Sequence, residues 1–491
     1  MTLTRPAPDL RPETAGPPVP SARPPRAFAL IPALVALVLG LWGLERGGSM
    51  WRDEAATYDM ARRTLPELLH TLGSVDAVHG LYYLLMHAVF ALFGDSLYAL
   101  RLPSLLAMSA ATAGVAVLGG RLAGPRAGLL AGLAFTLLPA VQRYAQEGRS
   151  YALVCAAVTW ATWLFVRALE ERRLRLWLGY GALALTACLL HEFAVLAVAA
   201  HGVTLCLSPH SREDRRAWTW TAAAVAAVLA PLAVVSSLQS EQVAWIGPPG
   251  PGALLGYLVP ALAGLLCAAL LPAARRQLRV LALPLLILPG GVLLLATALH
   301  PLYISRYVLY EEAGLALLLG AALDHLWRRR WHRLPLALLV AASAVVALTQ
   351  VGQHLRSPEG RKDDLSGIAR AVGTQGRPGD GLLFMPGKLR IWQAAEPEAF
   401  TGLVDLAERT DPRSSDTLYG VELPPAAIHG RMLAADRIVA LREPAGEPVD
   451  DTAREKAKRD VLRTHFRVCG STEVHGARVT VYARPGRCDP A

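Results

Sequence analysis

The chain has 491 residues, of which 53% are hydrophobic and only 18% are charged. Several apolar runs approach the roughly 20 residues that a helix needs to cross a bilayer, which excludes an ordinary soluble enzyme. The formal net charge of +10 does not indicate nucleic-acid binding, because the arginines form short patches between the apolar runs and no single basic face.

The N-terminal segment divides into a tail and a first helix. Residues 1–26 are rich in proline and arginine, so we expect a disordered cytoplasmic tail. The first apolar run, residues 28–44, lies where a signal peptide would, but residues 45–48 behind it offer no convincing small-residue cleavage site. We therefore expect a retained helix that carries the chain outward.

Arginine patches fix the number of later crossings. If each patch is cytoplasmic, the chain crosses an even number of times between neighbours. The apolar stretch 174–208 then forms two short helices that turn outside at His191, and residues 81–93 lie along the outer interface. A membrane domain over residues 27–352 with about eleven transmembrane helices is predicted. The patches are Arg121/Arg126, Arg167/Arg172/Arg173/Arg175, Arg212/Arg215/Arg216, Arg275/Arg276/Arg279 and Arg328/Arg329/Arg330/Arg333.

The first outer loop, residues 45–98, begins with an acid pair, Asp53-Glu54, just past the first helix. Adjacent carboxylates at the membrane boundary suit a general base or a substrate-binding group, and the alternative is an ordinary polar loop edge. Further acids fall on the same predicted face, although the arginine rule made no use of them. This gathering indicates one extracytoplasmic site assembled from several loops. The further acids are Asp59, Asp76, Glu147, Glu192, Glu241, Glu311 and Glu312.

The rest of the first loop adds candidate substrate ligands. His79 and Tyr82 lie at the start of the interfacial helix, where His79 is a predicted substrate ligand and the tyrosine alone would be part of an aromatic belt. Arg101, near the start of the next helix, either binds substrate or extends to the outer headgroups.

Residues 143–151 crowd charges and tyrosines into one turn between two short helices, among them Arg143, Glu147, Arg149 and Tyr151. Glu147 either pairs with one of these arginines or contacts substrate directly. His191, at the turn of a helical hairpin, is either a capping residue or a substrate ligand.

Arg306 and Tyr307 follow a short polar turn on the outer side. A guanidinium group can fork onto phosphate oxygens and a tyrosine can donate to them, so this pair suits a lipid-linked phosphate. The alternative is again an arginine that extends to the headgroups.

After about Gln353 the composition changes, because all four lysines lie beyond it and no later run is long enough to span. Residues 353–491 are predicted to form a small extracytoplasmic α/β domain. Its expected strands are residues 381–385, 437–441 and 479–482, and its expected helices are 364–372 and 451–463.

Cysteine positions fit this division. Cys469 and Cys488 fall in the soluble domain, where an oxidising compartment makes a disulfide plausible. The other four lie in apolar helices and read as packing residues. No spacing typical of a metal site occurs, so no cofactor is required by the sequence. The four are Cys155, Cys188, Cys206 and Cys267.

Together these segments resemble the multi-pass membrane glycosyltransferases of the GT-C fold. They are most similar to glycosyltransferase family 39, which includes the protein O-mannosyltransferases, and within it to the actinobacterial mannosyltransferase-like proteins. The chain has His79-Gly80-Leu81 where many relatives have His-Pro-Pro-Leu, so the local turn differs. The matching segments are residues 51–55, 76–87, 93–94, 101–104, 146–153, 305–307, 361–368 and 379–380.

The resemblance implies an inverting transferase at the outer face of the plasma membrane. Its donor would be a sugar, mannose by family default, on a polyprenyl phosphate, and its acceptor a hydroxyl of a glycan, lipid or protein. By the same resemblance, Asp53 is the general base, Glu54 its substitute or an acceptor ligand, and Arg306 and Tyr307 hold the phosphate. Some relatives bind a divalent cation. Nucleic acid is not an expected partner.

Two other function classes compete with this hypothesis. A transporter or lipid-linked-sugar flippase would also be polytopic, but it usually shows internal repeats or charges near mid-bilayer. An inactive sensor or scaffold would leave the acid pair and Arg306 dispensable.

Overall fold

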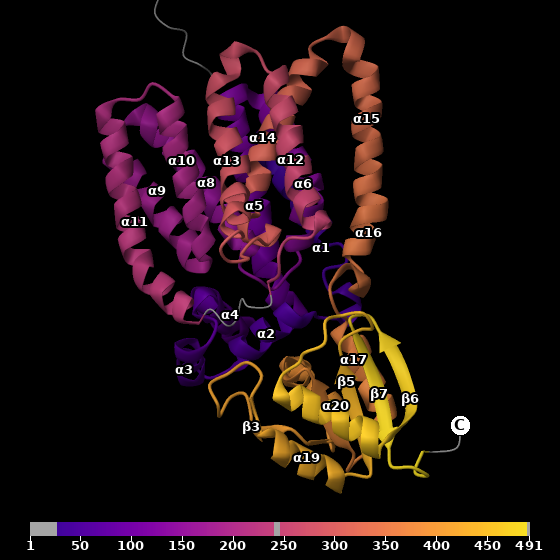
Figure 1. Ribbon diagram of the computed structural model, residues 1–491. Helices are drawn as coiled ribbons and strands as arrows, with labels where there is room; N and C mark the ends of the chain where they lie inside the picture. The colour runs from indigo at the N-terminus through magenta and orange to yellow at the C-terminus, as the bar shows by residue number, and fades with distance from the viewer. Residues whose placement is uncertain (1–26, 240–245, 489–491) are drawn as a thin grey trace, which may run out of the picture.

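The computed structural model describes residues 27–239 and 246–488. Long helices stand side by side in a bundle, and a smaller α/β domain lies at one end of it (Figure 1). Seven helices in these two ranges are long and apolar enough to cross a membrane. Four of them are α5 (Leu97–Ala123), α8 (Tyr151–Glu171), α11 (Arg212–Leu238) and α12 (Pro251–Leu270). The other three are the segments Phe28–Gly48, which contains most of α1 (Ala27–Leu41), Ala273–Ala296, which contains α13 (Arg276–Ala296), and Arg333–Leu355, which begins with α15 (Arg333–Val346).

The remaining predicted crossings are shorter helices in the same bundle. They contain 13 to 17 residues each and pack beside the long ones, so every segment expected to cross is helical. The expectation of an all-α polytopic membrane protein is therefore confirmed. The shorter helices are α6 (Pro125–Leu137), α9 (Leu174–Leu190), α10 (Val195–Leu207) and α14 (Glu311–Trp327).

Glycines bring the central helices into backbone contact. A Cβ atom at Gly128 of α6 would lie 2.3 Å from the carbonyl oxygen of Ala116 in α5. One at Gly320 of α14 would lie 2.4 Å from the backbone nitrogen of Ala131. Small residues at such crossings are what allows helices to pack closely where apolar lipid provides no driving force.

Between the bundle and the α/β domain lie α2 (Arg52–Arg62), α3 (Leu65–Ser74) and α4 (Gly80–Phe93) (Figure 1). The α4 helix is the segment expected along the membrane interface, and it is short and apolar. A capping box of Thr64 and Glu67 starts α3. These three helices place the first turn of α2, with the acid pair, directly under the bundle.

The α/β domain contains a five-stranded sheet of order β2-β1-β5-β7-β6. The strand β1 (Gly381–Met385) runs parallel to β2 (Val404–Asp405) and β5 (Arg437–Arg442), and β7 (Ala477–Ala483) is antiparallel to β5 and β6 (Arg467–Val474). The three predicted strands are all present. The sheet is accompanied by α17 (Leu365–Gln375), α19 (Pro425–Ala434), α20 (Ala453–His465) and the hairpin β3 (Glu408–Thr410)–β4 (Val421–Glu422).

Cysteines follow the expected division with one exception. Cys469 and Cys488 form a disulfide, with Cα atoms 5.3 Å apart. Cys155 and Cys188 are buried in the bundle. The expectation that all four helical cysteines pack internally is wrong for Cys206, which is exposed on α10.

The α/β domain is tied to the first loop through Arg52, the residue before Asp53. Its Nε lies 3.0 Å from Oδ2 of Asp363, its backbone nitrogen donates to Oδ1 of Asp363 at 2.7 Å, and Nη1 lies 3.1 Å from Glu443. The ring of Trp392 lies 5.5 Å from the same guanidinium group. The two domains therefore share buried polar contacts at the position of the acid pair.

Asp363→Ala is expected to loosen this docking, because the buried backbone N–H of Arg52 loses its partner and the guanidinium group loses one of its two carboxylates. The lost buried contacts are worth about 1–3 kcal/mol, so amide hydrogen exchange in residues 361–368 should become faster by about fivefold or more. Asp460→Ala, at an exposed pair with Arg463, is the matched control and should leave exchange unchanged. Equal exchange in both variants would contradict the docking role.

Candidate active site

The Asp53 side chain contacts Arg306, a residue about 250 positions later in the sequence. The Asp53 side chain, in the first turn of α2, is 25% exposed, and Oδ2 lies 3.3 Å from Nη2 of Arg306. Arg306 lies in a single 3-10 turn, Ser305–Val308, just before α14. Its Nε also donates to the hydroxyl of Tyr151 at 3.1 Å. The sequence placed these residues on one face, and the structure brings Asp53, Tyr151 and Arg306 into contact.

Aromatic rings surround the Arg306 guanidinium group. The centroids of Trp51, Tyr151 and Tyr307 lie 5.8, 5.8 and 5.6 Å from it. Cation–π contacts of this kind hold a guanidinium group without using its N–H donors. Because a guanidinium group carries five N–H donors, Arg306 retains the capacity to bind an anion beside Asp53.

Arg149, in the turn before α8, holds the opposite side of the acid pair. Its Nη1 lies 3.4 Å from the backbone carbonyl oxygen of Asp53 and 3.4 Å from Oγ1 of Thr57. The same nitrogen lies 3.2 Å from the hydroxyl of Tyr83, which donates in turn to the Asp76 carboxylate. Burial raises the pKa of Asp76, since the charged carboxylate loses water.

Two histidines lie together at the edge of this network. The rings of His79 and His191 are 5.7 Å apart, and His191 also lies 4.5 Å from the ring of Tyr307. Burial lowers the pKa of both histidines well below the ordinary value, so both are neutral at pH 7. The Nδ1 atoms of both are buried and have no hydrogen-bond partner within the described part of the chain. This arrangement suits contacts to uncharged hydroxyl groups.

Glu54 differs from its neighbour, because it is fully buried. Arg101 binds it through Nε at 2.9 Å and Nη2 at 2.8 Å, Arg46 binds it through Nη2, and the backbone nitrogen of Gly148 donates to it at 2.9 Å. Burial opposes the charged form, but Arg101 and Arg46 outweigh it and hold the pKa of Glu54 below its usual range. Such a carboxylate is shielded from substrate.

Arg101 lies in the same interior cluster. It is fully buried and also donates to the carbonyl oxygens of Leu44 at 2.7 Å and Ser49 at 2.5 Å. The expectation that Arg101 reaches the lipid headgroups is therefore wrong, because its side chain lies in the protein interior. The reason is Glu54, which draws the guanidinium group inward although the residue lies near a helix end.

Glu147 is also buried and forms two ion pairs. Its Oε1 lies 2.8 Å from Nε of Arg361 and 3.4 Å from Nε of Arg143. The ion-pair alternative therefore describes its contacts, with Arg143 and Arg361 as partners.

Tyr82 is fully buried in α4, beside Tyr83. The sequence alone did not predict the roles of Arg46 and Arg361. No local pattern connects Arg46 with Glu54, 8 residues away, or Arg361 with Glu147, more than 200 residues away.

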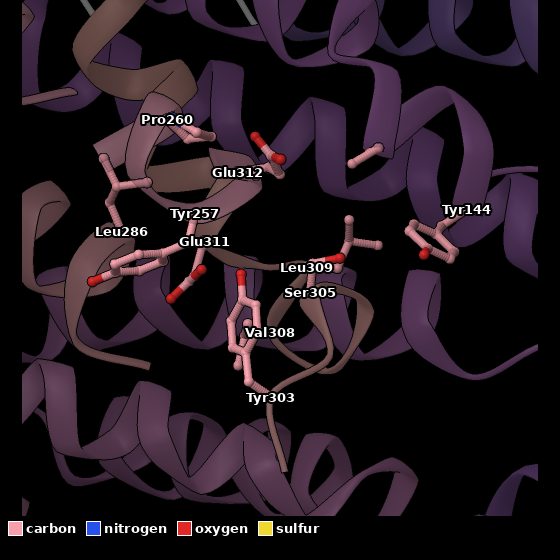
Figure 2. Close-up of a pocket in the computed structure, with 12 residues that line it drawn as sticks. Tyr144, Tyr257, Pro260, Leu286, Tyr303, Ser305, Val308, Leu309, Glu311 and Glu312 are labelled. Atoms are coloured by element: carbon pink, nitrogen blue, oxygen red, sulfur yellow. The ribbon is translucent and has the colours of Figure 1, made fainter. Parts of the chain in front are cut away.

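A second feature lies beside the Arg306 turn. A cavity of about 40 Å³ is lined by tyrosines and by two carboxylates in the first turn of α14, Glu311 and Glu312 (Figure 2). Ser305, the residue before Arg306, also contributes to its wall. In the described ranges no group of three or more histidine, cysteine or acidic side chains is placed to hold a metal ion.

Comparison with known proteins agrees with this architecture. Residues 80–236 match the family model described as dolichyl-phosphate-mannose-protein mannosyltransferase. No curated protein sequence matched the chain.

Among solved structures, ArnT from Cupriavidus metallidurans in the apo state is 13% identical, with a TM-score of 0.57 over 93% of this chain and 98% of that one. ArnT bound to undecaprenyl phosphate has the same identity and a TM-score of 0.56, over 95% and 100% of the two chains. The oligosaccharyltransferase AglB from Archaeoglobus fulgidus, in complex with an inhibitory peptide and a dolichol-phosphate, is 11% identical, with a TM-score of 0.51 over 84% and 69%.

These similarities confirm the GT-C fold that the sequence resemblance implied, whereas the actinobacterial branch stays a prediction. The chain is therefore a multi-pass membrane protein of the GT-C fold, and its segment 80–236 is similar to the dolichyl-phosphate-mannose-protein mannosyltransferases.

Proposed function

We propose that the protein is a glycosyltransferase that moves a sugar from a polyprenyl-phosphate donor to a hydroxyl acceptor. The observation that carries the proposal is the contact of a part-exposed carboxylate, Asp53, with Arg306 at one end of a GT-C bundle. Two of the similar structures are complexes, one with undecaprenyl phosphate and one with a dolichol-phosphate, which supports a lipid-linked donor. The site then faces outward, residues 353–491 form an extracytoplasmic domain, and residues 1–26 remain in the cytoplasm.

In the proposed reaction Asp53 acts as the general base. A hydroxyl is a poor nucleophile, so the carboxylate accepts its proton while the hydroxyl oxygen bonds to the anomeric carbon. The bond from that carbon to the phosphate oxygen breaks, and its electron pair leaves with the lipid phosphate. Attack opposite to the leaving group inverts the configuration. Asp53 is exposed enough to reach the acceptor, whereas Glu54 is not.

Arg306 and the tyrosines around it stabilise the departing phosphate. The charge that develops on the bridging oxygen is met by a fixed guanidinium group and by the hydroxyls of Tyr151 and Tyr307. No protonated acid is needed, because the lipid phosphate is already anionic. We propose that Arg149, His79 and His191 contact the donor, and that Glu54, Arg101, Arg143, Glu147 and Tyr82 position the site.

Arg306→Gln tests this proposal directly. Loss of a positioned cation at a developing anion costs about a hundredfold or more in kcat, so transfer of label from radiolabelled polyprenyl-phosphate mannose to a cell-wall acceptor fraction should fall by that factor. Arg306→Lys keeps the positive charge but cannot form two parallel hydrogen bonds to a phosphate. Its rate of transfer should therefore lie between that of the wild type and that of Arg306→Gln. Arg463→Gln, at an exposed site of α20, is the control and should transfer normally. Normal transfer by Arg306→Gln would refute the assigned role.

Mannose is the first donor to test, because the matched family model carries it in its description. A panel of other polyprenyl-linked hexoses and pentoses follows if mannose is not transferred. The proposal fails if wild-type protein transfers no sugar of the panel to any acceptor fraction.

A further inference from the structure

The loop between β3 and β4, residues 411–420, joins the α/β domain to the membrane domain at a second point. It extends toward α3 (Figure 1). Arg63, the fully buried residue that ends α2, donates from Nη2 to the carbonyl oxygen of Thr417 at 2.8 Å. The same guanidinium group pairs with Asp59 at 2.8 Å and donates to the hydroxyl of Thr71 at 2.6 Å. The loop is therefore held against the first outer loop.

The α/β domain itself fixes the other end of this loop. Buried Arg390 donates from Nη1 to the carbonyl oxygen of Tyr419 at 2.7 Å and pairs with Asp405 at 2.7 Å. Gly420 follows with a φ of +72°, and a Cβ atom there would lie 2.8 Å from the carbonyl oxygen of Thr410. Glycine is the residue that adopts this conformation without strain. The backbone on both sides of Tyr419 is thus fixed before any substrate binds.

These contacts place the α/β domain over both ends of α2. Arg52, the first residue of the helix, pairs with Glu443 at 3.1 Å. Arg63, directly after its last residue, binds Thr417. Asp53 lies in the first turn, between these two points. The α/β domain therefore covers the side of α2 that faces away from the bundle (Figure 1).

Tyr419 lies near the acids of the candidate site. Its ring is partly buried against the core that also contains Trp392. Burial raises the pKa of Tyr419 to about 12, and the negative charges of Asp76 and Asp53 contribute to the rise. A carboxylate has this effect on a neighbouring group only at short range. The phenol is neutral at physiological pH, so it does not compete with Asp53 as a base.

The proposed mechanism makes water a competitor of the acceptor. A carboxylate that takes a proton from an acceptor hydroxyl can also take one from water. In that side reaction the water oxygen bonds to the anomeric carbon, the bond from that carbon to the phosphate oxygen breaks, and Asp53 receives a water proton. Free sugar is then released. Because the Asp53 side chain is 25% exposed, what covers it on the aqueous side decides how often this happens.

We propose that Tyr419 makes the site select the acceptor hydroxyl over water, an assignment that rests on the proposed function. Arg306, and with it the leaving phosphate, lies on the bundle side of Asp53, and inversion requires the nucleophile to approach from the opposite side. Tyr419 belongs to the domain on that side. Its ring provides an apolar wall, and a single water needs two or more polar partners to stay in place for attack. A larger acceptor is held by its other contacts.

The test measures transfer and hydrolysis in one assay. Membranes that contain the full-length protein receive radiolabelled polyprenyl-phosphate mannose and the acceptor fraction, and the label is counted in the acceptor and in free sugar. Tyr419→Ser removes the ring and should raise hydrolysis relative to transfer by about tenfold or more, since even one methylene group in a substrate pocket changes discrimination by about that factor. Tyr419→Phe keeps the ring and should raise the ratio much less.

Tyr419→Gln keeps most of the bulk but offers polar partners to water, so it should also raise hydrolysis. This variant tests the apolar wall even if Tyr419→Ser does not fold. Arg413→Ser, at an exposed position of the same loop, is the matched control and should show the wild-type ratio. The added hydrolysis should disappear when Asp53→Asn is combined with Tyr419→Gln, because the base is then missing. Wild-type ratios in Tyr419→Ser and Tyr419→Gln, or added hydrolysis that persists without Asp53, would overturn the proposal.

Failure here is separable from failure of the proposed function. Transfer of sugar by the wild-type protein tests the transferase alone, with mannose or with another sugar of the panel. An active wild type whose Tyr419 variants keep its ratio of hydrolysis to transfer would remove the role of Tyr419 and leave the transferase intact.

Discussion

Asp53→Asn is expected to lower kcat for sugar transfer by at least about a hundredfold, because a positioned general base contributes a factor of about 10² to 10⁴. Asparagine keeps the size of the side chain and still accepts a hydrogen bond from Arg306, which lies 3.3 Å away. It has no site that takes up the acceptor proton. Donor binding should change little, so the effect should appear in kcat and not in KM.

Membranes that contain each variant at matched protein levels would be assayed with the radiolabelled donor and acceptor fraction. Asp95→Asn is the control, because Asp95 lies in the same loop and pairs with Arg62 at 3.0 Å on an exposed surface. It should retain normal transfer. If Asp53→Asn were as active as Asp95→Asn, the base would have to be another group, and Asp76 would be the next acid to test.

Glu54→Gln is expected to destabilise the protein by about 3–5 kcal/mol, the cost of removing one partner from a buried ion pair. Arg46 and Arg101 would remain buried beside a neutral amide. An NH₂ group, which donates hydrogen bonds, would replace one of the Glu54 oxygens that accept from them. The free energy of unfolding in detergent micelles measures this loss. Glu170→Gln, at an exposed pair with Arg121, should change it by less than about 1 kcal/mol.

The same carboxylate predicts the direction of a pH effect. The folded-state pKa of Glu54 is depressed, so its contribution is complete above the ordinary glutamate pKa of about 4.3 and declines as the pH falls below that value. Wild-type stability should therefore decrease over this acidic range more steeply than that of Glu54→Gln. Parallel curves for the two proteins would contradict the buried ion pair.

These two variants separate neighbours that the sequence treats alike. Asp53 and Glu54 are adjacent acids in one loop, and only the helical turn of α2 directs one toward Arg306 and the other toward Arg46 and Arg101. The apolar runs predicted the positions of the membrane helices, because hydropathy is a local signal. Which acid meets which arginine depends on contacts between segments hundreds of residues apart, and no periodicity records them.

The same distinction holds in the α/β domain. Strand β1 is a continuous apolar run and was predicted with its observed bounds, because all five of its residues are buried. Strand β6 was not predicted, since its mostly exposed residues show no apolar alternation and it forms only through pairing with β7. The α14 carboxylates were recognised as acids of one face, but the cavity that they share with Tyr257 and Tyr303 required the packing of three helices.

The ion pair between Glu147 and Arg361 has a consequence for how the protein is made. Glu147 is buried in the membrane domain, yet one of its two partners is translated more than 200 residues later, beyond the last membrane helix. During synthesis the helices must therefore insert while this carboxylate still lacks Arg361, and Arg52 likewise awaits Asp363 and Glu443. Assembly of the site is thus completed only when the C-terminal segment arrives, and a chain truncated before Arg361 retains the whole bundle with an incomplete site.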